Sequence, residues 1–147
     1  MALLASTGLR NKMLDTGALR TVLTLGFIKI YAGAVPTTAN DSLGAATLLC
    51  TISNNSTGTG VTFAVTAANG AIAKSAEVWS GVNTATNTAT FFRHVLSSDD
   101  GLLSTTQVRL QGTAGVTGTD LLLASSVLTS GVTTLIDSYS IQLPTLT

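Results

Sequence analysis

The stretch Phe27-Ile28-Lys29-Ile30-Tyr31-Ala32 alternates two kinds of side chain along its whole length. Its even-numbered side chains are all aliphatic and fall on one side of an extended chain. The odd-numbered ones, which include a lysine and a tyrosine, fall on the other side. A period of two residues predicts a β-strand rather than a helix. The same alternation recurs in residues 46–52 and 61–67, so the prediction extends beyond one segment.

Further segments with strand-like sequence follow towards the C-terminal end. They are residues 71–80, 86–96, 104–111, 120–128 and 132–143. Turn clusters rich in Gly, Asn, Asp and Ser separate them, and about eight short strands spaced in this way predict an all-β domain over residues 26–147. We expect an antiparallel sandwich or barrel, similar to a jelly roll. Ser130-Gly131 predicts a hairpin turn, and the glycines Gly112, Gly115 and Gly118 predict a bend between two strands.

Residues 1–25 differ from the rest of the chain. They hold three of the seven cations and have apolar residues at roughly helical spacing, but two glycines weaken a helix here. We therefore expect an extended N-terminal arm with room for one short helix, which becomes ordered on contact with a partner. The side chains expected to make that contact are Leu9, Arg10, Lys12, Met13, Leu14 and Arg20.

Charge is scarce in this chain. Its 147 residues include 7 basic and 7 acidic side chains, so 10% of them are charged, against about 25% in an ordinary domain. Seven scattered cations do not form the basic stripe of a nucleic-acid-binding protein. The longest apolar runs, 22–30 and 121–124, are too short to span a membrane. Because a net charge near zero favours association, we expect a surface occupied by other protein, with neither nucleic acid nor membrane as a partner.

No residue pattern indicates catalysis or a cofactor. His94, the only histidine, shares a strand face with apolar Phe92 and Leu96, and a structural role is favoured over a hydrolase because no G-x-S-x-G motif is present. Glu77 is the only glutamate, so paired carboxylates are not expected. Cys50 is the only cysteine, which excludes an intrachain disulfide and a cysteine-built metal site. We expect a non-enzymatic protein without a cofactor.

The dipeptide Asp99-Asp100, followed by glycine, allows two interpretations. Together with Asp120 it could contribute oxygen ligands to a cation, but calcium requires six to eight such ligands. Two aspartates before a glycine are more typical of a turn. We expect the turn, and the sequence leaves the cation open.

Four further residues are expected in an interface or an ion pair. Asp137 follows Leu135 in a segment that predicts an apolar strand face, so its charge needs a partner. Arg93 or Arg109 could supply a bidentate pair. Trp79 is expected in the core, with the anchor of an interface as its alternative.

Five segments together resemble a known class of protein. They are GLRNKMLD (8–15), GFIKIYAGAVP (26–36), EVWSG (77–81), TATFFR (88–93) and STTQVRLQG (104–112). The chain resembles small virion structural proteins of tailed bacteriophages, and within that group it is most similar to capsid decoration, or cement, proteins. The resemblance implies synthesis in the host bacterial cytoplasm and a place on the outer face of the capsid. It also implies the major capsid protein as partner, and often a homotrimer.

Three other functions stay open at this stage. The first is another virion β-protein from a tail, a head–tail joint or a fibre, because composition does not separate head from tail. The second is a carbohydrate-binding module, which needs exposed aromatic residues, although aromatics make up only 5% of the chain. The last is a hydrolase built around His94.

Overall fold

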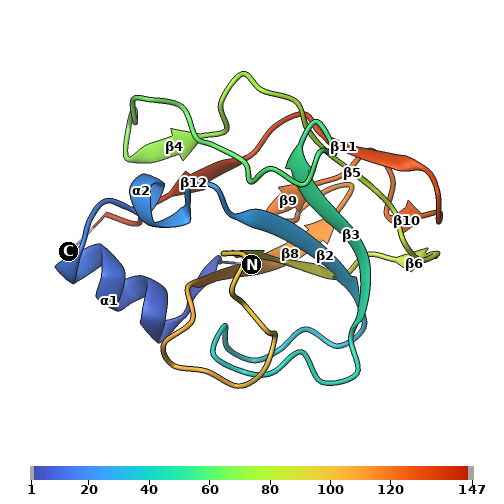
Figure 1. The fold of residues 1–147 in the computed structure, drawn as a ribbon, viewed down its shortest axis with the longest axis horizontal. Helices are drawn as coiled ribbons and strands as arrows, with labels where there is room; N and C mark the ends of the chain where they lie inside the picture. Colours follow the sequence, from blue (N-terminus) through green and yellow to red (C-terminus); the bar gives the residue numbers. More distant parts are fainter. Residues whose placement is uncertain (1, 146–147) are drawn as a thin grey trace.

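The computed structural model describes residues 2–145, and its centre is one large β-sheet (Figure 1). In spatial order, its strands are β1 (Leu4–Ala5), β8 (Arg109–Gly115), β7 (Phe91–Val95), β2 (Phe27–Ala32), β3 (Thr47–Asn54), β5 (Trp79–Val82) and β11 (Thr133–Ile136). An eighth strand, β9 (Leu121–Leu122), pairs with β8 in the parallel direction, whereas all other pairs are antiparallel. The prediction of an all-β fold is confirmed.

Two small strand pairs flank the large sheet. β12 (Ser140–Gln142) pairs with β4 (Ala71–Ala73), and β10 (Val127–Leu128) pairs with β6 (Asn87–Thr88). Figure 1 shows the β4–β12 pair near helix α2 and the β6–β10 pair at the opposite end of the view. Together with the sheet they enclose the core.

One face of the sheet carries the hydrophobic core, as the period of two requires. Ile28 and Ile30 of β2 lie directly opposite His94 and Phe92 of β7, and all four side chains are fully buried. Trp79 of β5 lies on the same face and is also fully buried. Burial of these large side chains is the main source of folding free energy.

The opposite face carries polar residues under two long loops. Arg93, Arg109 and Gln111 are fully buried there, although their strands place them on the side away from the aliphatic core. Segments 33–46 and 97–107 cover them: the first supplies hydrogen-bond acceptors to both arginines, and the second supplies them to Arg109. The sheet therefore has an apolar core on one face and a buried polar cluster on the other.

The N-terminal segment is part of the folded body. α1 (Thr7–Asp15) and α2 (Leu19–Leu23) place Leu9 and Leu23 in the core with no exposed surface. The Ser6 hydroxyl accepts from the Leu9 N–H at 3.1 Å and donates to the Gln107 carbonyl at 2.7 Å, which caps α1 and ties it to the rest of the chain. The expectation of an extended arm with room for one short helix is corrected: residues 7–15 and 19–23 form two helices, and Leu9 and Leu23 from them lie in the core.

Three local expectations are also corrected. Residues 61–67 form isolated bridges, such as Phe63 with Lys74, instead of a strand. The turn at Ser130-Gly131 joins β10 to β11, but these pair with β6 and β5 instead of with each other. Gly112 and Gly115 lie inside β8 rather than in a bend, whereas Gly118 lies in the bend between β8 and β9. A Cβ at Gly112 would lie 2.8 Å from the Phe92 ring, so this position of the strand needs glycine.

Candidate functional site

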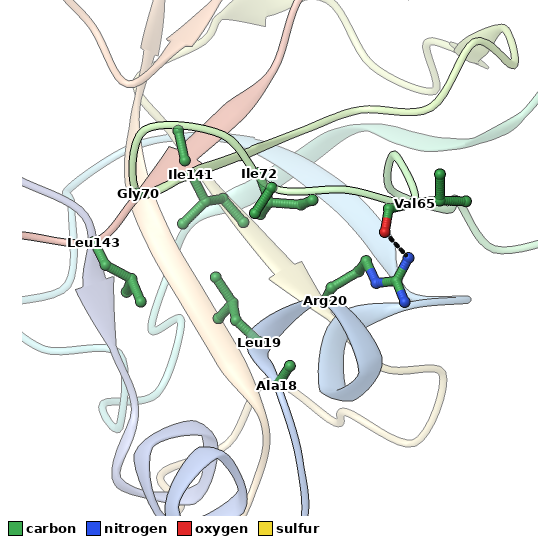
Figure 2. Close-up of a pocket in the computed structure, with 10 residues that line it drawn as sticks. Ala18, Leu19, Arg20, Val65, Gly70, Ile72, Ile141 and Leu143 are labelled. Atoms are coloured by element: carbon green, nitrogen blue, oxygen red, sulfur yellow. Dashed lines mark hydrogen bonds between the residues drawn. The ribbon is translucent and has the colours of Figure 1, made fainter.

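The start of helix α2 borders an apolar groove, named the α2 groove below (Figure 2). Its volume is about 250 Å³. Its lining residues are almost all aliphatic or small: Ala18, Leu19, Arg20, Val65, Ala67, Gly70, Ala71, Ile72, Ile141 and Leu143. The walls are α2 on one side and the segment from Val65 through β4, with β12, on the other.

Local sequence explains the shape of the α2 groove. Asn69 and Gly70 both have positive φ angles, 51° and 75°, which permits a tight turn between Ala68 and Ala71. The main-chain groups of these two alanines exchange hydrogen bonds of 2.9 Å. At the rim, Arg20 Nη1 donates to the Val65 carbonyl at 2.8 Å, as Figure 2 shows. The guanidinium therefore contributes a positive charge to an otherwise uncharged lining.

The structure separates the six residues expected in the arm. Arg10, Lys12 and Leu14 are exposed on the outer side of α1, and Leu14 retains 84% of its surface. Met13 is half-buried and packs against the core. Leu9 is fully buried and does not reach a partner in this conformation. The accessible part of the prediction is therefore Arg10, Lys12 and Leu14, with Arg20 at the groove.

Arg109 is held by a buried carboxylate. Its Nε lies 2.6 Å from Asp99 Oδ1, and its Nη2 donates to the Leu102 carbonyl at 2.7 Å. Asp100 is more distant, at 3.6 Å, and its side chain is largely exposed. The expected pair of Asp137 with Arg93 or Arg109 is wrong: β11 ends at Ile136, Asp137 is exposed, and Arg109 pairs with Asp99. A place for Asp137 in an interface stays a prediction.

Arg93 lies next to this pair but depends on neutral partners. Its Nε donates to Gln111 Oε1 at 2.8 Å, and its Nη2 donates to the Asp41 carbonyl at 2.8 Å. Burial, and then the nearby Arg109, lower the pKa of Arg93. The loop 33–46 is thereby fixed to the sheet by both arginines, which gives these side chains a structural role.

Two of the aspartates considered as cation ligands, Asp99 and Asp120, bind other groups of the protein. Asp99 contacts the Arg109 guanidinium, and Asp120 Oδ2 accepts from the Thr113 N–H and hydroxyl at 2.9 and 3.0 Å. Within residues 2–145, no group of three or more His, Cys, Asp or Glu side chains is arranged to hold a metal.

His94 and Trp79 belong to a buried aromatic cluster. His94 Nε2 lies 3.2 Å from the Leu23 carbonyl, and the ring stacks on Phe63 with centroids 5.4 Å apart. Burial lowers the pKa of His94 to about 4. Trp79 Nε1 donates to Glu77 Oε1 at 3.0 Å. Trp79 therefore lies in the core, as the first of its two interpretations predicts.

Glu77 connects several segments, a role that the sequence analysis missed. Its carboxylate accepts from Trp79, from Asn54 Nδ2 at 3.0 Å and from the Thr62 main chain. The available signal is its position two residues before the only tryptophan. No sequence pattern predicts that Asn54 and Thr62 contact this carboxylate.

The surface carries many aliphatic side chains. Within residues 2–145, the exposed leucines and valines are Leu14, Leu25, Val35, Leu48, Val65, Val78, Val82, Leu102, Leu103, Val116, Leu122, Val127, Val132, Leu135 and Leu143. Single exposed aliphatics are ordinary, but groups of them mark contact surfaces. The described chain presents such groups both around the α2 groove and near β11.

Comparison with known proteins returned no match to a family model, to a curated protein or to a solved structure. None of the helices in residues 2–145 has the length and apolar character needed to cross a bilayer.

Proposed function

We propose that this chain is a non-enzymatic structural protein of a tailed-bacteriophage virion, and specifically a decoration protein that binds the major capsid protein on the outer capsid surface. The observation that carries the proposal is the combination of many exposed aliphatic side chains with a surface of low charge. Such a surface favours association with other protein. The resemblance of the five segments 8–15, 26–36, 77–81, 88–93 and 104–112, taken together, to decoration proteins supplies the specific partner.

We place the capsid contact on the N-terminal helices. Arg10, Lys12 and Leu14 are exposed there, and Arg20 lies at the rim of the α2 groove. A protein that binds an assembled shell better than its separate subunits stabilises the shell through linkage. Self-association into an oligomer, which the resemblance implies, would add avidity by providing several contacts at once.

Binding to the shell tests this placement. Labelled full-length protein is incubated with purified capsids that lack it, and the bound fraction is measured after sedimentation. We expect Leu14→Asp with Lys12→Glu to lower the affinity by a factor of about ten or more, equivalent to about 1.4 kcal/mol. The control is Val116→Asp, which puts the same acidic side chain on an exposed position between β8 and β9. Equal binding of all variants would reject the N-terminal contact.

Immunogold labelling of intact virions tests the location. Label on heads supports a decoration protein, and label on tails alone supports the alternative of a tail, head–tail joining or fibre-associated protein. Absence of label from virions would reject both.

A carbohydrate-binding module is disfavoured by the position of the aromatic residues. Phe91, Phe92 and Trp79 have no exposed surface, and Tyr31 and Tyr139 retain only 4% of theirs. Sugar recognition by such modules relies on exposed aromatic rings, so a glycan array is expected to show no binding.

A further inference from the structure

The large sheet ends on one side in β11. β11 (Thr133–Ile136) is the last strand in the sheet order and pairs only with β5. Figure 1 shows it beside β5, away from α1. At the other end of the sheet, β1 and β9 both pair with the outer side of β8. Within residues 2–145, β11 therefore pairs with no strand on its outer side, and Thr133, Thr134 and Leu135 line a cavity of about 300 Å³ together with residues 124–125 and 127–129.

The main-chain groups on this edge can be assigned from the ladder. The Asn83 N–H donates to the Val132 carbonyl at 2.9 Å, one residue before β11. Main-chain groups of alternate residues in an antiparallel strand point towards the same neighbouring strand. The main-chain N–H and C=O of Thr134 therefore point towards β5, whereas those of Thr133 and Leu135 point outward. No hydrogen bond within residues 2–145 involves the main-chain N–H or C=O of Thr133 or Leu135 outside the ladder. Each of these two residues therefore presents a free donor and a free acceptor.

The edge has no protection against pairing. Exposed edges in native proteins commonly carry lysine, proline or a bulge, which block the addition of another strand. β11 has the sequence Thr-Thr-Leu-Ile and includes none of them. Leu135 is 52% exposed, and the neighbouring Val82 and Val132 are exposed to a similar extent. β11 therefore carries no charged residue, and Leu135, Val82 and Val132 add exposed apolar surface beside its free main-chain groups.

We propose that β11 pairs with β11 of a second copy of this chain, antiparallel, around a twofold axis at Thr134. In this register, Thr133 of each copy lies opposite Leu135 of the other. Each such pair exchanges two hydrogen bonds, so every free main-chain group of these two residues gains a partner. The two large sheets then form one continuous sheet.

Charge and symmetry favour a second copy over an unrelated strand. In the same register, Asp137 of each copy lies opposite Gly131 of the other, so the two carboxylates do not meet. An isologous contact requires a surface that is complementary to itself. The free groups of Thr133 and Leu135 are placed symmetrically about Thr134, which meets that requirement.

The contact predicts an even number of subunits, whereas the resemblance to decoration proteins implies three. It does not depend on the proposed virion function, because it rests on the geometry of β11 alone. The two ideas can therefore fail separately.

Sedimentation velocity of the full-length protein across a dilution series tests the pairing. We expect the wild type to reach twice the monomer mass and Leu135→Pro to remain monomeric. Proline at this position removes an outward-facing N–H and leaves the Thr134 ladder to β5 intact. Thr133→Lys adds a charge to the edge without changing the backbone. We expect this variant to remain monomeric too.

Thr117→Lys is the matched control, because it makes the same change at an exposed turn elsewhere. It should retain the dimer, and circular dichroism should show that all three variants are folded. Hydrogen exchange adds a local readout: the amides of Thr133 and Leu135 should be protected in the dimer and exchange rapidly on dilution. A monomer at every concentration, a trimer, or a dimer that survives both edge substitutions would overturn the proposal.

Discussion

Asp99 holds the fully buried Arg109 in place at 2.6 Å, and the Asp99 side chain is itself almost inaccessible to solvent. Removing one member of a buried ion pair leaves the other charge without compensation, at a cost of about 3–5 kcal/mol. We therefore expect Asp99→Asn to lower the free energy of unfolding by about that amount in urea denaturation. Asp100→Asn provides the control, because its side chain is largely exposed and it lies 3.6 Å from the same arginine. A loss below about 0.5 kcal/mol for it is expected.

His94 makes stability depend on pH in the acidic range. Its pKa is lowered from 6.5 to about 4 by burial, so the folded state binds its proton less readily than the unfolded chain does. The resulting contribution is fully present above pH 6.5 and is lost as the pH falls from 6.5 to about 4. We expect His94 to account for a loss of about 3 kcal/mol over this window, measured by urea denaturation at each pH.

The variant His94→Gln isolates this contribution. Glutamine does not titrate, so the slope of stability against pH between 4 and 6.5 should become shallower even if the variant is less stable throughout. An unchanged slope would assign the pH dependence to other groups.

At the scale of elements, α1 contributes to the core instead of waiting for a partner. Leu9 is fully buried and Leu14, on the same helix, is 84% exposed. We expect Leu9→Ala to destabilise the isolated protein by about 2–5 kcal/mol, the usual range for a buried leucine. Leu14→Ala should change stability by less than about 0.5 kcal/mol. Thermal unfolding of the purified protein distinguishes them, and equal melting temperatures would restore the interpretation of a loose arm.

The sequence predicted features that follow from the alternation of side chains within one segment. It did not predict features that follow from contacts with residues far away in the chain. The alternation in 27–32 predicted β2, and the same period in 86–96 placed His94 on one strand face with Phe92, as β7 has it. The period does not reveal that 61–67 contributes single bridges, because pairing partners come from elsewhere in the chain. Asp137 was misassigned for the related reason that Leu135, taken as part of a buried face, lies on the exposed side of an edge strand.

The candidate site was predictable only in part. Cationic Arg10, Lys12 and Arg20 were identified from their concentration in the first 25 residues. The α2 groove was not, because its walls come from segments more than 40 residues apart in sequence, as the hydrogen bond between Arg20 and Val65 illustrates.

At the scale of the whole molecule, the balance of charge predicts how association responds to salt. The net charge is zero, and β11 carries no charged residue. Salt screens interactions between charges but leaves main-chain hydrogen bonds and apolar contacts largely intact. We expect the dissociation constant of the dimer to change by less than about threefold between low and physiological ionic strength, since no charge pair forms across the contact. Size-exclusion chromatography coupled to light scattering provides the measurement, and dissociation by moderate salt would indicate an electrostatic contact instead.

The pairing of β1 with β8 also determines when this chain can fold. Ala5 lies opposite Leu110, so the first strand has no partner until most of the chain has been synthesised. At about 5–20 residues per second, a ribosome needs roughly 5–20 s to travel between these two positions. During that time the apolar side of α1 has no core to cover it, and non-local pairing of this kind also slows folding after release. The N-terminal strand thus cannot pair until residue 110 has been made, although it is the first strand to be synthesised.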